Sequence, residues 1–367
     1  MKKLLKFLAS KPGIIVTGAV IGILAPVLVK LGNPANMGIC VACFERDIAG
    51  ALGLHRAAIV QYLRPEIPAF VLGSFIAALL AGEWKARTGS APIVRFVLGA
   101  FSMIGALVFL GCPWRAWLRL SGGDWNAVFG LLGLFAGILI GIVFLKRGYS
   151  LGRNHPSPKA LGLVMPLLSV GLLALAILVP LFGRGADGQA IGPIFRSAKG
   201  PGAMAAPIAV SLAVGLVIGF MAQRSRFCTV GAVRDVVLFR DPHLMLGIAA
   251  LFVFALGTNL VLGQFKAGFE GQPVAHADGL WNFGGMMLSG LAFTLAGGCP
   301  GRQLFLSGEG DGDAGVFVLG MIVGAGFAHN FNLASSATGP SPYGPAATVF
   351  GLVVVAAIGL GFREKSS

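Results

Sequence analysis

An apolar stretch of the chain ends at GGCPGRQ, residues 297–303, where a thiol, a proline and an arginine follow two glycines. The motif has a twin, because residues 111–115 (GCPWR) match residues 298–302 (GCPGR). Each copy leads into a Leu-x-Leu-Ser-Gly stretch, which begins at Leu118 in one copy and at Leu304 in the other. A motif that recurs in the same context indicates an internal repeat.

A second pair of cysteines lies upstream of the first. Each is followed six and seven residues later by an arginine and an aspartate: Cys40 by Arg46 and Asp47, and Cys228 by Arg234 and Asp235. The spacing to the downstream motif is nearly the same in both halves, since Cys112 follows Cys40 about as far along the chain as Cys299 follows Cys228. Four of the five cysteines therefore belong to a two-fold repeat.

The composition is that of an integral membrane protein. Hydrophobic residues make up 56% of the chain and charged residues 11%, against about 25% charged residues in soluble domains. Apolar segments long enough, or nearly so, to cross the bilayer are expected at residues 13–30, 67–82, 92–111, 126–145, 161–182, 204–222, 244–264, 281–298, 314–332 and 343–362. The fold class is thus an all-α membrane protein with about ten transmembrane helices.

The repeat divides these segments equally within one membrane domain, residues 1–367. The first repeat, residues 13–182, and the second, residues 204–362, each hold five segments, so the second enters the membrane from the opposite side. Such inverted repeats are common in transporters. Most Lys and Arg residues fall on the side of the N-terminus, which predicts both termini in the cytoplasm. The net charge of +14 is accounted for by loops beside anionic lipid, not by nucleic acid.

The two Cys-Pro motifs predict short re-entrant helices. Pro113 and Pro300 suit the first helical position, with Cys112 and Cys299 as N-caps. Gly111 and the pair Gly297-Gly298 would let the chain bend sharply beforehand. These helices are too short to span the bilayer, so we expect them to be buried in protein or to line a cavity, with their positive N-termini facing the pathway.

The arginines suggest an anionic substrate. Arg115 and Arg302 lie three residues after their cysteines, about one helical turn away, on the same face as the thiol. A charge within the membrane is usually functional, although either side chain could instead extend to the interface. Arg46 and Arg234 each have a neighbouring aspartate and are expected to form ion pairs or cap contacts.

Cys40 and Cys43 form a C-x-x-C without a counterpart, because Gly231 occupies the matching position. A disulfide or persulfide relay between them is one interpretation. Metal binding is not favoured, since His55 is the only further ligand nearby. The other histidines do not cluster, no catalytic triad or zinc motif occurs, and no carboxylate lies within a predicted span. The sequence therefore predicts no catalytic residues, metal or cofactor, and thus no enzyme.

These cysteine motifs resemble the YeeE/YedE family of bacterial inner-membrane proteins over nearly the whole chain, and residues 33–70 resemble its selenium-metabolism subgroup. The resemblance implies thiosulfate uptake by an hourglass of helices, in which thiols pass the anion along by S–H···S contacts. Carried over to this chain, it implies pathway roles for Cys40, Cys112, Cys228 and Cys299. The neighbours Pro113, Pro300, Gly111, Gly298, Arg115, Arg302, Arg46, Arg234 and Cys43 would support them.

We therefore expect an inner-membrane transporter for a small sulfur or selenium anion, with a selenium compound favoured and with thiols that stay neutral during passage. One alternative is a membrane redox or sulfur-transfer protein that carries persulfide or selenide on Cys40 or Cys43. Another is a subunit that delivers cargo to a cytoplasmic sulfur- or selenium-handling protein.

Overall fold

Helices form almost all of the regular structure in the computed structural model, which describes residues 2–178 and 194–363. The long helices are α2 (Lys11–Lys30), α4 (Glu66–Ala81), α5 (Pro92–Phe109), α7 (Asn126–Lys146), α8 (Lys159–Leu178), α9 (Ile208–Ser225), α11 (His243–Val261), α12 (Gly279–Ala296), α14 (Gly312–Asn330) and α15 (Gly344–Gly361). Each coincides with one predicted segment, which confirms the all-α membrane fold. Residues 179–182 of the fifth predicted segment lie outside the described residues.

Nine of these described helices are long and apolar enough to cross a membrane, while α4, with 16 residues, is shorter. The largest difference from the predicted bounds is at α9, which starts at Ile208 and not at residue 204. Pro207 is its N-cap, and a proline disfavours the helical conformation in the residue before it. The remaining elements are the helix α1 (Lys2–Leu8), the 3-10 turn η1 (Pro201–Ala203), and the paired strands β1 (Arg87–Thr88) and β2 (His155–Pro156).

Four short helices lie in the middle of the molecule: α3 (Val41–Ala51), α6 (Pro113–Ser121), α10 (Thr229–Phe239) and α13 (Pro300–Gly308). Nine to eleven residues extend only about 14–17 Å at 1.5 Å per residue, half the thickness of the hydrocarbon layer. The short helices α6 and α13 confirm the prediction from the Cys-Pro motifs. Those at α3 and α10 were not predicted, because no proline marks their first turns.

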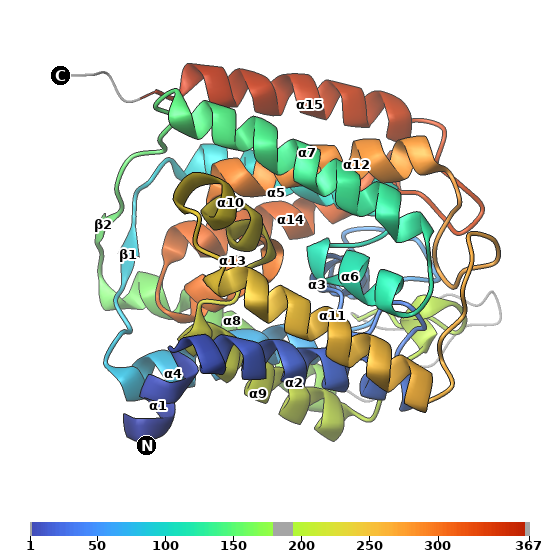
Figure 1. Ribbon diagram of the computed structural model, residues 1–367, viewed down its shortest axis with the longest axis horizontal. Helices are drawn as coiled ribbons and strands as arrows, with labels where there is room; N and C mark the ends of the chain where they lie inside the picture. Colours follow the sequence, from blue (N-terminus) through green and yellow to red (C-terminus); the bar gives the residue numbers. More distant parts are fainter. Residues whose placement is uncertain (1, 179–193, 364–367) are drawn as a thin grey trace.

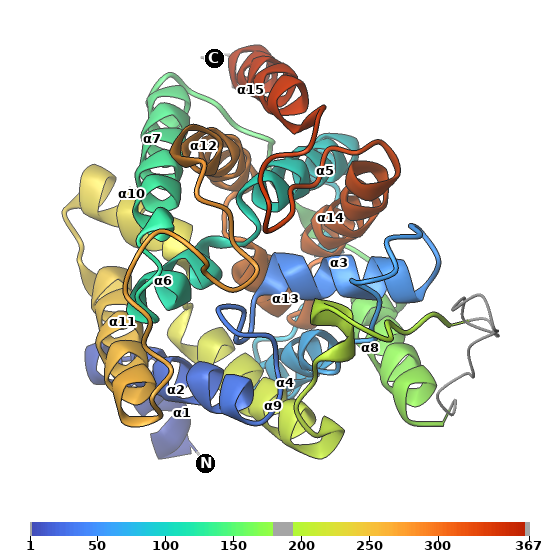
Figure 2. The same cartoon turned by 90° about the vertical axis from the view of Figure 1, so that its right-hand side faces the viewer.

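Long helices surround these half-helices in two layers, above and below them in Figure 1. In one layer α7 packs against α12 and α5 against α14, and in the other α2 packs against α11 and α4 against α9. Figure 2 shows the same two layers end-on, with α3, α6, α10 and α13 between them. Each of these pairs joins a helix from the first half of the chain to one from the second. The two halves therefore pack directly against each other in both layers.

Glycine allows the helices within a layer to touch backbone to backbone. A Cβ atom at Gly18 of α2 would lie 1.9 Å from the carbonyl oxygen of Gly247 in α11, and one at Gly137 of α7 would lie 2.1 Å from that of Met287 in α12. No side chain fits in this space, so these glycines form helix-packing seams. The seams hold the layers in which the half-helices are seated.

Candidate functional site

A cysteine precedes each half-helix. Cys40, Cys112, Cys228 and Cys299 are the N-cap residues of α3, α6, α10 and α13. Before α6 and α13 the proline at the first position supplies the start, as predicted. Before α3 and α10 the thiol itself caps the helix, since the Sγ atom accepts the backbone N–H of Cys43 at 3.4 Å and of Gly231 at 3.2 Å, respectively.

These N-caps meet in two pairs, one from each half of the chain. The Sγ atoms of Cys40 and Cys112 are 3.7 Å apart, and the backbone N–H of Cys299 donates to Sγ of Cys228 at 3.5 Å. All five cysteines are free and buried. Each pair therefore places two thiols, and the positive ends of two half-helices, at one buried point.

The first pair is joined by a third thiol and an arginine. Nη1 of Arg115 lies 3.2 Å from Sγ of Cys43 and also donates to the carbonyl oxygen of Leu110. Its Nε and Nη2 donate to the carbonyl oxygens of Asn36 and Val274. Arg115 is fully buried, so it does not extend to the interface, and none of its partners among the described residues is a carboxylate. A guanidinium charge without a counterion thus faces this group of thiols.

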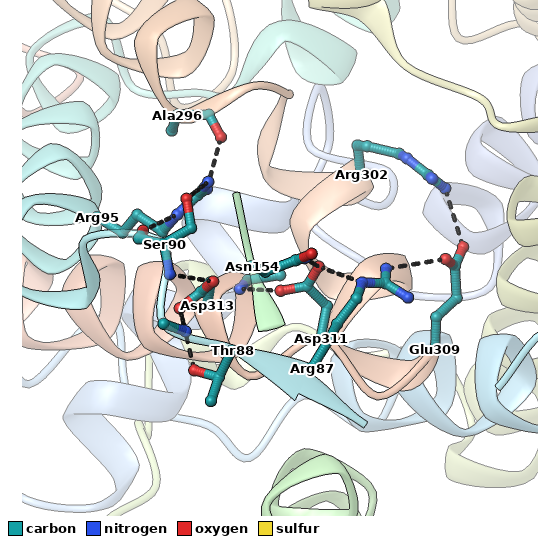
Figure 3. A network of polar contacts seen from close by, with 12 residues as sticks. Arg87, Thr88, Ser90, Arg95, Asn154, Ala296, Arg302, Glu309, Asp311 and Asp313 are labelled. Atoms are coloured by element: carbon teal, nitrogen blue, oxygen red, sulfur yellow. Dashed lines mark hydrogen bonds and ion pairs between the residues drawn. The ribbon is translucent and has the colours of Figure 1, made fainter. Parts of the chain in front are cut away.

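Arg302 in the second half differs. Its Nη1 lies 3.2 Å from Oε1 of Glu309, at the far end of α13 (Figure 3). Arg302 therefore has a protein carboxylate as its counterion, whereas Arg115 has none among the described residues. Sequence reasoning missed the pair, because nothing in the spacing shows that the side chain runs along α13 toward its C-terminus.

Arg46 and Arg234 form ion pairs with their neighbouring aspartates, as expected. Asp47 is buried and binds two arginines, with Nη2 of Arg46 and Nε of Arg64 each 2.7 Å from its carboxylate. In the second half the Arg234–Asp235 pair is partly exposed. The Asp47–Arg64 pair therefore ties α3 to the segment before α4, whereas the Arg234–Asp235 pair lies within α10.

Trp114 contacts residues next to the second thiol pair while itself following Cys112 of the first, a role that no sequence signal indicates. It follows Cys112 by two residues, and its ring packs edge-on against Phe227, the residue before Cys228, with centroids 5.5 Å apart. A Cβ atom at Gly301 would lie 3.0 Å from Cζ2 of Trp114. Its buried Nε1–H has no acceptor in the part of the chain that the structure describes. The indole thus bridges the neighbourhoods of the two pairs and carries a donor without an acceptor among the described residues.

One buried carboxyl group also escaped the sequence analysis. Glu45 lies in α3, which was not predicted to be a helix within the membrane domain. Its side chain is fully buried, and neither oxygen has a hydrogen-bond partner among the described residues. Glu45 is therefore a buried polar group near the site, and its carboxyl group contacts no thiol among the described residues.

A cavity of about 180 Å³ opens beside α6, near the first thiol pair. Its lining includes Asn36, Gly38, Leu118, Asn259, Lys266 and Gln272. Gly38 is two residues before Cys40, and the carbonyl oxygen of Asn36 is the one that binds Arg115. The cavity is therefore a vestibule with a mainly apolar wall and one positive side chain, Lys266, near the segment that leads to Cys40.

The C-x-x-C segment has no further ligands for a metal. His55 is turned away from the thiols, with Nε2 3.0 Å from the carbonyl oxygen of Arg46, and its ring stacks on His329. Within residues 2–178 and 194–363, no group of three or more His, Cys, Asp or Glu side chains could hold a metal ion.

Part of the chain is similar to known proteins. Residues 224–361, which include α10 to α15, match the family profile described as sulphur transport. Two curated relatives are each named thiosulfate transporter TsuA: one from Spirochaeta thermophila is 34% identical over 99 residues, and one from Escherichia coli is 30% identical over 99 residues. Each match covers 27% of this chain and less than a third of the relative, 29% and 28% respectively.

Proposed function

We propose that this chain, whose residues 224–361 match the sulphur transport family profile, carries a small anion with a terminal sulfur or selenium atom across the bacterial inner membrane. The observation that carries this proposal is the meeting of two cysteine N-caps in each half of the chain. Helix N-termini attract anions, and thiols are soft, weak donors that suit a polarizable sulfur or selenium atom.

The residues suggest a route for the anion. It enters through the vestibule at Asn36 and Lys266 and reaches Cys40, Cys43 and Cys112, where Arg115 offsets its charge. It then passes the indole of Trp114, whose free Nε1–H is a ready donor, to Cys228 and Cys299. In the described state the thiols are buried, so at least one side of this route must open during transport.

The architecture we propose is an inverted repeat of residues 13–182 and 204–362 within a single membrane domain, with both termini in the cytoplasm. The packing of α2 on α11 and of α9 on α4 supports it, because exchanging the two repeats converts one pair into the other. In this arrangement the vestibule faces outward, and the basic loops beside Arg226 face the anionic inner leaflet.

The resemblance of residues 33–70 to the selenium subgroup favours a selenium compound as the cargo, with thiosulfate as the closest sulfur alternative. Delivery of the cargo to a cytoplasmic sulfur- or selenium-handling protein would be consistent with either a selenium compound or thiosulfate as the cargo.

The proposal is tested by uptake of radiolabelled selenium and of labelled thiosulfate into cells that express the protein, with Cys299→Ala as the control. We expect uptake that depends on Cys299. Selenium uptake that resists excess thiosulfate would identify a selenium permease, and thiosulfate uptake would identify a thiosulfate transporter. Uptake of neither, despite normal insertion into the membrane, would refute transport.

One observation favours a second candidate, a covalent carrier. Arg115 lies 3.2 Å from Sγ of Cys43, where its charge would attract the thiosulfate anion and offset the negative charge of a persulfide on that cysteine. A thiolate of Cys43 or Cys40 would attack the outer sulfur of thiosulfate, and sulfite would leave with the electrons of the broken S–S bond, so that a persulfide remains. This candidate requires a mass increase of one sulfur atom on Cys40 or Cys43, and loss of activity in Cys43→Ser.

A further inference from the structure

The side chains of the matched residues Arg115 and Arg302 begin in the same way and then reach different partners. Each side chain lies over the glycine before its cysteine, since a Cβ atom at Gly111 would be 2.8 Å from Cδ of Arg115, and one at Gly298 would be 3.0 Å from Cγ of Arg302. From there Arg115 reaches the thiol of Cys43, whereas Arg302 reaches Glu309. Figure 3 shows Arg302 extended toward that carboxylate.

The difference has a cause in the sequence. The Leu-x-Leu-Ser-Gly stretch of the second half continues with Glu309, while that of the first half continues with Gly123. The first half has a carboxylate one residue further on, at Asp124, but it pairs with Arg119 and not with Arg115, which stays with the thiols. Without Glu309, the side chain of Arg302 would be free to turn toward the thiols of its own half.

Glu309 neutralises a cluster of positive side chains. Its Oε1 accepts from Arg226 at 2.9 Å, from Arg302 at 3.2 Å and from Gln223 at 3.4 Å, and its Oε2 lies 3.5 Å from Arg87. The carboxylate is 4% exposed, but Arg226 is 45% exposed. The cluster therefore connects the half-helix of Cys299 to an aqueous face of the protein.

We infer that Glu309 is an internal anion that competes with the transported anion for Arg302. This inference rests on the proposed function. An anion at Cys228 and Cys299 can bind Arg302 only after the guanidinium leaves Glu309 and turns toward the thiols, as Arg115 does. When Glu309 recaptures Arg302, the anion loses its counterion and is released toward Arg226. This competition lowers the affinity of Cys228 and Cys299 for the anion. The reduction grows with the fraction of time that Arg302 is bound to Glu309.

The test is the uptake of radiolabelled thiosulfate by liposomes that contain the purified full-length protein. Glu309→Gln keeps the size of the side chain but removes the charge, so we expect KM to fall by at least about threefold and the maximal rate to fall with it, because release is slower. Asp311→Asn is the matched control, since Asp311 binds Arg87 in the same network but not Arg302. It should transport like the wild type.

A second comparison separates competition from a general structural effect. In the Arg302→Gln background the Glu309→Gln change should no longer lower KM, because no guanidinium remains to be released. If Glu309→Gln does not yield folded protein, Glu309→Asp, whose shorter side chain weakens the contact with Arg302, should lower KM in the same direction.

A KM that is unchanged or raised in the folded Glu309 variant, with normal wild-type uptake, would overturn this inference and leave the proposed function intact. Absence of uptake by the wild type itself would refute the proposed function.

Discussion

The indole of Trp114 rests against Gly301, with Cζ2 3.0 Å from the place where a Cβ atom of that glycine would be. The two residues hold matching positions in the Cys-Pro-x-Arg motifs of the two halves. A large residue in one copy therefore fills the space that the small residue in the other copy leaves. This contact lets one ring bridge the neighbourhoods of the two thiol pairs and makes Trp114 the central barrier of the proposed route.

Removing that ring should open the barrier. We expect Trp114→Ala to speed the reaction of Cys112 and Cys299 with an anionic thiol reagent by at least about tenfold, and to cost about 3–5 kcal/mol of folding free energy, as large-to-small changes of buried aromatic residues do. Trp114→Phe keeps a ring but loses the Nε1–H, so labelling should stay slow while anion transport falls. Equal labelling rates in wild type and Trp114→Ala would show that the indole is no barrier.

The buried aspartate of α3 should matter far more than its counterpart in α10. Asp47→Asn leaves the guanidinium groups of Arg46 and Arg64 buried without a carboxylate, which typically costs about 3–5 kcal/mol. Asp235→Asn is the matched control in the second half, where the partly exposed pair with Arg234 contributes about 1 kcal/mol or less. Thermal unfolding in detergent compares the two variants, and similar losses in Tm would contradict the assignment.

Acid should weaken the fold through His276, in the loop before α12. Burial lowers the pKa of His276 from its usual value of 6.5, although a hydrogen bond to the carbonyl oxygen of Val108 partly opposes the shift. The unfolded chain therefore takes up a proton near pH 6.5, while the folded protein takes it up only at lower pH. Stability contributed by this residue is present above pH 6.5 and is lost as the pH falls below it.

The measurement is Tm from pH 8 to pH 5 for wild type and His276→Gln, with the exposed His155→Gln as control. The wild type should lose more stability toward pH 5 than His276→Gln does, and His155→Gln should follow the wild type. Parallel curves for wild type and His276→Gln would rule out this origin of acid sensitivity.

The sequence allowed prediction of those features that depend on local signals. Long apolar runs gave all ten long helices, because the bilayer demands length and hydrophobicity together. Proline after cysteine gave the starts of α6 and α13. The half-helices α3 and α10 were missed because their caps are thiols, which carry no strong local preference.

The tertiary partners could not be read from the sequence. Arg302 binds Glu309, seven residues later, while Arg115 binds backbone carbonyl oxygens far along the chain. Both arginines have the same local motif, so only the packing of the half-helices decides which partner each one meets. The same holds for Trp114, whose neighbours come from α4, from the residue before the N-cap of α10, and from α13.

The central claim is that the paired thiols form the path of the anion. The most direct measurement is uptake of radiolabelled thiosulfate, and of a labelled selenium compound, by liposomes that contain wild type, Cys112→Ala, Cys299→Ala or Cys43→Ala. We predict that Cys112→Ala and Cys299→Ala each lower the rate by at least about tenfold, the equivalent of about 1.4 kcal/mol, while Cys43→Ala retains uptake. Wild-type uptake that persists unchanged in both Cys112→Ala and Cys299→Ala would contradict the claim.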